Sequence, residues 1–360
     1  MRWIVLSILV ALAAPVRSKA LAFRDATVVV APLLTLPKAN VIVRDGLIVD
    51  VAPGAEIPPD AEIVDGTGLT VYAGFIDGRS TLGLPSDTKR PLESLRQAEG
   101  EKPDFTKEAP PTMEQANRKG LRPDFDTSAA LNVSEAEAKK AHAGGFTIAV
   151  VALGDELLAG RAAIVTLTGG PKRNALLSGA GAMMGSFRTY GEGYPGTTMG
   201  TIAHLRQLFM DVRHARTLKD SYKPGAPRPA VDPAIEALQP VLAGEIPLFI
   251  EANSDRDILR AIRLAAEFQL TIGITGGAEA GRVADELHKR NIPVVLGLKL
   301  SKEAKPKEGE DVPDALRKER GRIREEEIDT ALRLHEAKVR FCFSTQGLAS
   351  STEALGAIQT

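Results

Sequence analysis

The sequence predicts an α/β protein in which a small N-terminal β-sandwich precedes a (β/α)8, TIM-like barrel. From Leu69 onward, buried apolar strands alternate with amphipathic helices, the pattern of a parallel sheet covered on both faces. Residues 24–64 instead show short apolar strands separated by turns. A chain of 360 residues with 44% hydrophobic and 25% charged residues is long enough for one large and one small domain.

Each element of the small subdomain is a short apolar run bounded by turn residues. Asp45-Gly46 predicts a hairpin, because glycine tolerates the positive φ that a type I′ turn requires. Asp65-Gly66-Thr67-Gly68 predicts the turn that ends the subdomain. The expected strands are Ala26–Val30, Asn40–Val43, Leu47–Val51 and Ala61–Val64.

The barrel is predicted from seven apolar strands and four helices. The strands are Val71–Ile76, Thr147–Ala152, Ala163–Thr168, Leu248–Glu251, Thr271–Ile274, Pro293–Leu298 and Val339–Phe343. The helices are Glu135–Ala143 behind the cap Ser134, Ile258–Phe268, Ala280–Arg290 and Glu325–Ala337. A further strand is expected around Ala175–Phe187, a long loop at Pro85–Pro123, and a solvated charged loop and helix face at Ser301–Glu326.

The N-terminus has the features of a signal peptide. Met1-Arg2 supplies a positive charge, and Trp3–Ala14 is almost wholly apolar but short for a membrane span. Ser18-Lys19-Ala20 and Ala20-Leu21-Ala22 both suit a signal peptidase, with an uncleaved anchor as the alternative. The predicted segments are a signal peptide at 1–22, a sandwich at 23–68 and a barrel at 69–360, in a protein that is periplasmic or secreted and has no membrane span after cleavage.

The composition narrows the possible partners. A formal charge of -1 and an aromatic content of 4% give neither a basic surface nor a base-stacking surface, so nucleic acid and acidic lipid are not expected partners. The single cysteine excludes an intrachain disulfide. The expected partner is therefore a small polar or anionic ligand, with a homo-oligomer or an active paralogue as further possibilities.

Several ordered segments carry a family resemblance. Gly74-Phe75-Ile76-Asp77 is followed by Arg79 and Thr81, and Ala143-Gly144-Gly145-Phe146-Thr147 precedes the second barrel strand. Residues 241–247 lead into the strand Leu248–Glu251, and residues 283–287 and 291–295 cover a helix and the strand that follows it. Together these resemble the amidohydrolase superfamily, and its imidazolonepropionase-like members in particular. The resemblance implies hydrolysis of non-peptide, often cyclic, carbon–nitrogen bonds at a metal held by histidines and an aspartate at strand ends.

The positions that the resemblance assigns to metal ligands are all substituted. The residues found there are Arg79, Thr81, Glu251, Asn253, Gly276 and Gln346. A guanidinium has no free lone pair, and one carboxylate does not make a metal site. All five histidines are expected on helices or helix ends, away from the strand termini where barrel enzymes assemble their chemistry: His142, His204, His214, His288 and His335. The sequence therefore predicts no metal and no other cofactor.

The vacated space leads to a hypothesis about what replaces the metal. Side chains alternate along a strand, so Arg79 and Glu251 point into the same mouth if the family register holds, and they are expected to form an ion pair. In the alternative, the two side chains point apart into solvent.

Three functions follow from these substitutions. The favoured one is an exported pseudoenzyme that binds a ligand at the old mouth. The second is a metal-independent hydrolase in which Glu251 and Arg79 are catalytic, although the arginine weakens the carboxylate as a base. The third is an interaction protein that partners an active paralogue.

The chain also stops at Thr360, where family members continue through strands that complete the sandwich, so the sandwich is reduced or the sequence is shortened.

Overall fold

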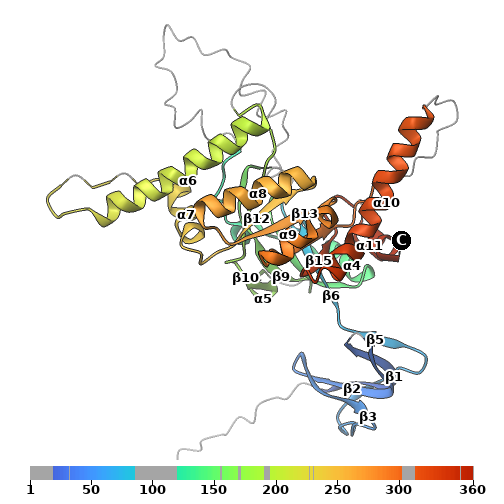
Figure 1. The fold of residues 1–360 in the computed structure, drawn as a ribbon. Helices are drawn as coiled ribbons and strands as arrows, with labels where there is room; N and C mark the ends of the chain where they lie inside the picture. Colours follow the sequence, from blue (N-terminus) through green and yellow to red (C-terminus); the bar gives the residue numbers. More distant parts are fainter. Residues whose placement is uncertain are drawn as a thin grey trace, which may run out of the picture. The chain divides into compact units, whose positions relative to one another are not determined.

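The computed structural model describes residues 19–359, apart from 32, 86–119, 155, 169–171, 190–194, 227, 230, 302–312 and 349. Most of the predicted signal peptide and of the loop at Pro85–Pro123 therefore lies outside the described residues. The chain forms two compact units that divide between Gly74 and Phe75 (Figure 1).

The first unit is one β-sheet of five strands. Its order is β3-β2-β1-β4, and β5 pairs with β1. Asp45 and Gly46 have φ values of 53° and 76°, which confirms the predicted positive-φ hairpin between β2 and β3. The second sheet of the predicted sandwich is not among the described residues. The strands are β1 (Leu21–Ala31), β2 (Leu34–Arg44), β3 (Leu47–Pro53), β4 (Glu62–Asp65) and β5 (Thr70–Tyr72).

The strand β1 begins inside the predicted signal peptide. Leu21 pairs with Val43 of β2 and with Glu62 of β4, while Ala20 and Ala22 are buried. Leu21 and Ala22, the last two residues of the predicted signal peptide, are thus part of the sheet. The same small apolar side chains that suit a peptidase also pack closely in a β-sheet.

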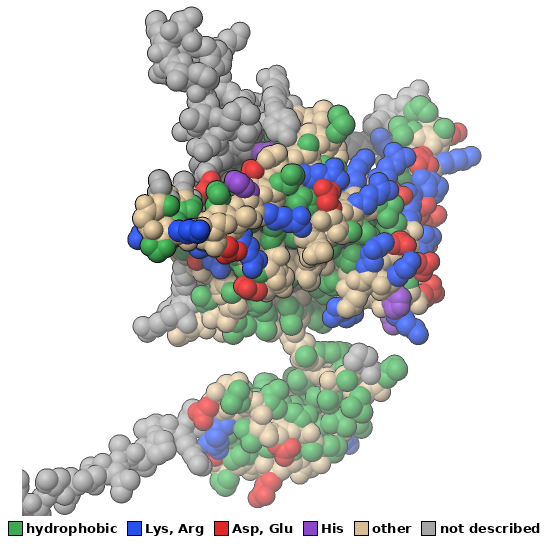
Figure 2. All heavy atoms as spheres, turned by 60° about the vertical axis from the view of Figure 1, so that its left-hand side comes forward, with side chains coloured by type: hydrophobic (Ala, Val, Ile, Leu, Met, Phe, Trp, Pro, Cys, Tyr) green, Lys and Arg blue, Asp and Glu red, His purple; other side chains and the backbone are tan. Residues whose placement is uncertain are grey.

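Hydrophobic side chains gather on the surface of the first unit (Figure 2). The edge strand β3 exposes Leu47, Ile48 and Val49 to 71%, 67% and 63%. The buried core of this unit is small and is centred on Ala26, Val28, Ala39 and Val41. The first unit is therefore a thin layer with an exposed edge strand.

The second unit is a mixed α/β structure with two sheets. One sheet has the order β10-β9-β7-β6 and the other β15-β14-β13-β12-β11-β8. Five strands from β11 to β15 are parallel, as predicted. The strands are β6 (Phe75–Ser80), β7 (Phe146–Val151), β8 (Leu158–Arg161), β9 (Ala163–Thr166), β10 (Leu176–Ser178), β11 (Met183–Ser186), β12 (Leu248–Ala252), β13 (Ile272–Gly276), β14 (Val294–Gly297) and β15 (Phe341–Ser344).

Two predictions about the strands were wrong. The segment predicted as Ala163–Thr168 runs antiparallel to β7, and β8 runs antiparallel to β11, so one extended stretch links the two sheets through Ala162. The single strand predicted at Val71–Ile76 is divided between β5 of the first unit and β6 of the second. Apolar composition alone does not show which neighbour a strand will pair with, and here two different sheets share one apolar run.

The helices pack on the strands of the second unit, and α8 buries Ile258, Ile262 and Phe268 in its main core. None of the described helices combines the length and apolarity needed to cross a membrane. The helices are α3 (Thr127–Ala130), α4 (Glu135–Ala143), α5 (Lys172–Ala175), α6 (Thr198–Asp220), α7 (Pro233–Leu242), α8 (Asp255–Phe268), α9 (Ala284–Lys289), α10 (Asp314–Glu336) and α11 (Ala354–Gln359), with short 3-10 turns η2 (Ala280–Val283) and η3 (Ser351–Glu353).

The sequence predicts the start of α4 correctly but places the start of α10 too late. The Ser134 side chain caps α4 and Glu137 completes a capping box, as the sequence predicts. The helix α10 begins at Asp314, well before the predicted Glu325, so much of the charged run is helical. Ion pairs one turn apart support it, such as those of Arg322 with Glu319 and Glu326.

Candidate functional site

The predicted ion pair is present at the ends of β6 and β12. The Arg79 Nη1 atom lies 2.9 Å from Glu251 Oε2, with side-chain exposures of 4% and 26%. The interpretation in which these side chains point apart is therefore wrong. A guanidinium this deeply buried needs a nearby negative partner, and Glu251 supplies it from the second sheet.

Neutral side chains complete this network. Arg79 Nη1 also donates to Thr275 Oγ1 at 2.7 Å, and Gln346 Nε2 donates to Glu251 Oε2 at 3.1 Å. Both bonds to the carboxylate use Oε2, so Oε1 has no hydrogen bond within the described part of the chain. The sequence indicated Gly276 at this strand end and missed Thr275. The signal is the register, because Thr275 pairs directly with Glu251.

Asp77 fixes the neighbouring strand end. Its Oδ1 accepts from the Thr345 backbone N–H at 2.9 Å and from the Arg79 N–H at 3.2 Å, and its Oδ2 accepts from the Thr345 hydroxyl. The side chain is buried, and this burial raises the pKa of Asp77 although the hydrogen bonds from Thr345 and Arg79 oppose the shift. Asp77 thus ties β6 to the segment that carries Gln346.

The raised pKa of Asp77 predicts a pH-dependent stability. At pH values between the unfolded and the folded pKa, the unfolded chain binds fewer protons than the folded one, so stability falls as pH rises through that window. We expect the unfolding free energy of the wild type to decline relative to that of Asp77→Asn as the pH rises above about 4, the ordinary pKa of an aspartate. Urea titrations at a series of pH values measure it, and a pH-independent difference contradicts it.

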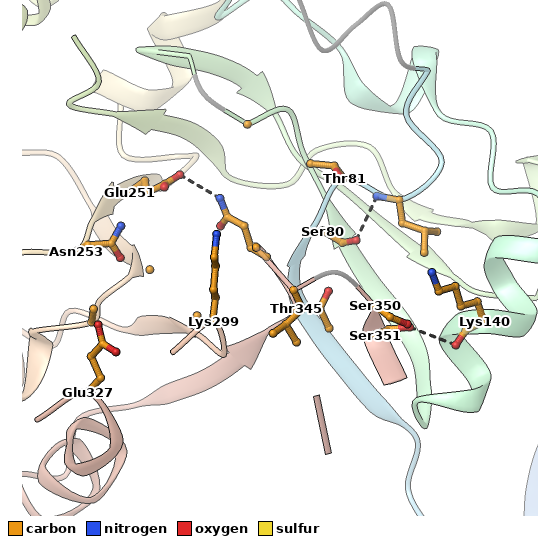
Figure 3. Close-up of a pocket in the computed structure, with 18 of the residues that line it drawn as sticks. Ser80, Thr81, Lys140, Glu251, Asn253, Lys299, Glu327, Thr345, Ser350 and Ser351 are labelled. Atoms are coloured by element: carbon orange, nitrogen blue, oxygen red, sulfur yellow. Dashed lines mark hydrogen bonds between the residues drawn. The ribbon is translucent and has the colours of Figure 1, made fainter. Parts of the chain in front are cut away.

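Above the ion pair lies a polar cavity of about 920 Å³. Five of the six predicted pocket residues line it, whereas Arg79 lies beneath it and is 3% exposed. Figure 3 shows Glu251 and Asn253 on one wall and Ser350, Ser351 and Lys140 on the other. The predicted lining residues are Thr81, Glu251, Asn253, Gly276 and Gln346. Lys140 and Lys299 also line the cavity, although no sequence motif indicated either lysine.

Gly276 adopts a conformation that only glycine accommodates easily. Its φ is 85°, and a Cβ built on it would lie 2.3 Å from Asn253 Oδ1. The amide of Asn253 therefore occupies the space that a side chain at position 276 would need.

These residues do not fit a metal centre. At the predicted ligand positions the only carboxylate is Glu251, and it already accepts from Arg79 and Gln346. Within the described ranges, no group of three His, Cys, Asp or Glu side chains is placed to hold an ion. The histidines lie on helices, as predicted, and none lines the cavity: His142, His204, His214, His288 and His335.

Comparison with solved structures identifies the fold. An amidohydrolase from Thermotoga maritima MSB8 matches with a TM-score of 0.72 and 23% identity, over 94% of this chain and 82% of that one. A prolidase complexed with N-methylphosphonate-L-proline matches with a TM-score of 0.47 and 17% identity, over 90% of this chain and 78% of that one. A beta-aspartyl dipeptidase from Fervidobacterium islandicum AW-1 matches with a TM-score of 0.40 and 14% identity, over 92% of this chain and 73% of that one. The last two similarities are too slight to bear on the fold. No family model and no curated protein matches the sequence.

Proposed function

We propose that this chain, which has the fold of the amidohydrolase superfamily, binds a small polar or anionic ligand without a metal. The ligand site is the cavity above the Arg79–Glu251 pair. In this proposal the two sheets of the second unit are arcs of one (β/α)8 barrel, with the cavity at its mouth. The hydrogen bonds between Asp77 and Thr345, which join the edge strand β6 to the end of β15, support that arrangement.

The observation that carries the proposal is the position of the Arg79 guanidinium. It lies against Glu251 and Thr275, at strand ends that the family resemblance assigns to metal ligands. A fixed positive charge in this place stabilises the carboxylate as a cation would, and it repels a second cation. Glu251 Oε2 also accepts a hydrogen bond from the side-chain amide of Gln346, so the protein itself supplies both donors to this oxygen.

Elemental analysis tests this proposal directly. Purified protein incubated with zinc and then dialysed is expected to hold less than about a tenth of an equivalent of metal. The same preparation is expected to turn over none of a panel of linear and cyclic amides. Stoichiometric zinc that is lost in Glu251→Gln would contradict the metal-free site, and a Glu267→Gln variant, altered at an exposed surface carboxylate, serves as the matched control.

A second function is favoured by the free oxygen of Glu251. Oε1 accepts no hydrogen bond among the described residues, and the side chain is exposed to 26% at the cavity wall. Glu251 as base and Arg79 as the group that stabilises a developing oxyanion would constitute a metal-independent hydrolase. Turnover that persists in chelator and is abolished by Glu251→Gln but not by Glu267→Gln supports this hydrolase. Its absence supports the binding function.

A further inference from the structure

Most carboxylate oxygens of the cavity wall already accept hydrogen bonds from the protein itself, and Glu251 Oε1 is the exception among the described residues. Glu251 Oε2 accepts from Arg79 and Gln346. Glu327 accepts from the backbone N–H and the hydroxyl of Ser301 through its two oxygens. A ligand that entered as a hydrogen-bond donor would therefore compete with bonds already made at these carboxylates.

A third carboxylate of the wall is engaged in the same way. Glu137 Oε2 accepts from the backbone N–H and the hydroxyl of Ser134, and Oε1 accepts from the backbone N–H of Gly83. These bonds hold the capping box of α4 and dock the segment before it. The function of Glu137 is thus structural, and it leaves little acceptor capacity toward the cavity.

Two lysine side chains of the same cavity differ from these carboxylates. Lys140 on α4 and Lys299 after β14 both line the cavity. Within the part of the chain that the structure describes, neither ammonium group makes an ion pair or a hydrogen bond. Each carries a full charge and three N–H donors. Figure 3 shows them extending toward the cavity from different sides.

The backbone conformation after β15 helps to place Lys299. Gly347 has a φ of 85°, and a Cβ built there would lie 2.8 Å from Lys299 Cδ. The alkyl chain of Lys299 thus lies directly over a backbone that has no side chain, and this close packing limits the positions open to the ammonium group.

From these contacts we propose that the cavity binds a small dianion whose two negative charges pair with Lys140 and Lys299. This inference rests on the proposed ligand-binding function and names the class of ligand. Both lysine side chains are exposed, so their donors are available to a ligand that brings acceptors, and two ammonium groups balance two negative charges. The three carboxylates of the cavity wall disfavour a larger polyanion: Glu137, Glu251 and Glu327. The volume of about 920 Å³ accommodates a short dicarboxylate with bound water.

Calorimetric titration with succinate, glutarate and inorganic phosphate tests the inference. We expect at least one of them to bind, and Lys140→Gln and Lys299→Gln each to weaken that binding about tenfold. Raising the ionic strength is expected to weaken binding to the wild type more than to either variant, because each variant has lost one ion pair. Binding of phosphate but of neither dicarboxylate identifies an inorganic dianion as the source of the charge.

Lys139→Gln is the matched control, since Lys139 is the preceding residue of α4 and does not line the cavity. It is expected to leave affinity unchanged. The inference is overturned if none of the three anions binds at about 10 mM, or if the Lys140→Gln/Lys299→Gln double variant binds as tightly as the wild type. Binding of neutral succinamide but of no anion would overturn the inference while leaving the metal-free ligand site intact. Stoichiometric zinc would instead overturn the proposed function.

Discussion

Replacing Arg79 with methionine is expected to destabilise the protein by about 2–4 kcal/mol, because the change leaves the Glu251 charge partly buried without its partner. It also removes the donor to Thr275, whose side chain is almost fully buried. Methionine retains much of the volume, so the loss reports mainly on the charge. Urea denaturation of the two proteins measures the difference in unfolding free energy.

The second partner provides the double-mutant cycle. If the pair itself carries the effect, adding Glu251→Gln to Arg79→Met is expected to recover part of the lost stability, since no unpaired charge remains. Arg206→Met is the control, because its Nε also lies 2.7 Å from a carboxylate, Glu267 Oε2, but the two side chains are 47% and 41% exposed. That variant should change stability by less than about 0.5 kcal/mol. An Arg79→Met loss no larger than the Arg206→Met loss contradicts the buried-pair account.

Replacing Gly276 with alanine is expected to cost about 1–3 kcal/mol, which combines backbone strain with the displacement of the exposed Asn253 side chain. The φ of 85° is unfavourable for an alanine, and the new Cβ would lie 2.3 Å from the side-chain oxygen of Asn253. By the same reasoning, Gly276→His does not rebuild the strand-six histidine that the family resemblance leads one to expect. Thermal and urea unfolding of the alanine variant measure the cost.

Gly244→Ala separates the two components of this cost. Gly244 has a φ of 75°, but a Cβ built on it meets nothing within 4 Å, so strain alone applies and a loss of about 1 kcal/mol is expected. Adding Asn253→Ala to Gly276→Ala removes the contact and should recover the overpacking part. Equal losses in Gly276→Ala and Gly244→Ala would show that Asn253 does not fill this space.

Arg79 and Gly276 each depend on one neighbouring side chain. Arg79 introduces a charge that must be neutralised, and Glu251 neutralises it. Gly276 removes a side chain, and Asn253 fills the space that results. These residues are therefore matched to one another across β6, β12 and β13 in a packed and hydrogen-bonded site.

Parts of this site could be predicted because local chemistry determines them. The ion pair of Arg79 and Glu251 was also predicted, but from strand alternation combined with the register that the family resemblance implies. The Ser134 capping box and the Asp45-Gly46 hairpin each depend on residues adjacent in sequence. Their geometry is set by the backbone preferences of those residues.

Other parts depended on contacts between distant segments. Nothing near Thr275 in the sequence shows that it lies beside Glu251, because strand register decides it. Lys140 and Lys299 come from a helix and from a strand end far apart in the chain, and only folding brings them to one cavity. The antiparallel direction of β8 and β9 is likewise a matter of which neighbours offer hydrogen bonds.

By itself, the sequence determined that the chain is α/β, that histidines are absent from the strand ends, and that Arg79 and Glu251 stand where the family resemblance leads one to expect metal ligands. The tertiary structure decided which partners those two residues take, which carboxylates are engaged, and which lysines keep free donors. The physical reason is that residue type sets the charge and hydrogen-bonding capacity of a group. Whether that capacity is satisfied depends on neighbours that only the folded chain brings within reach.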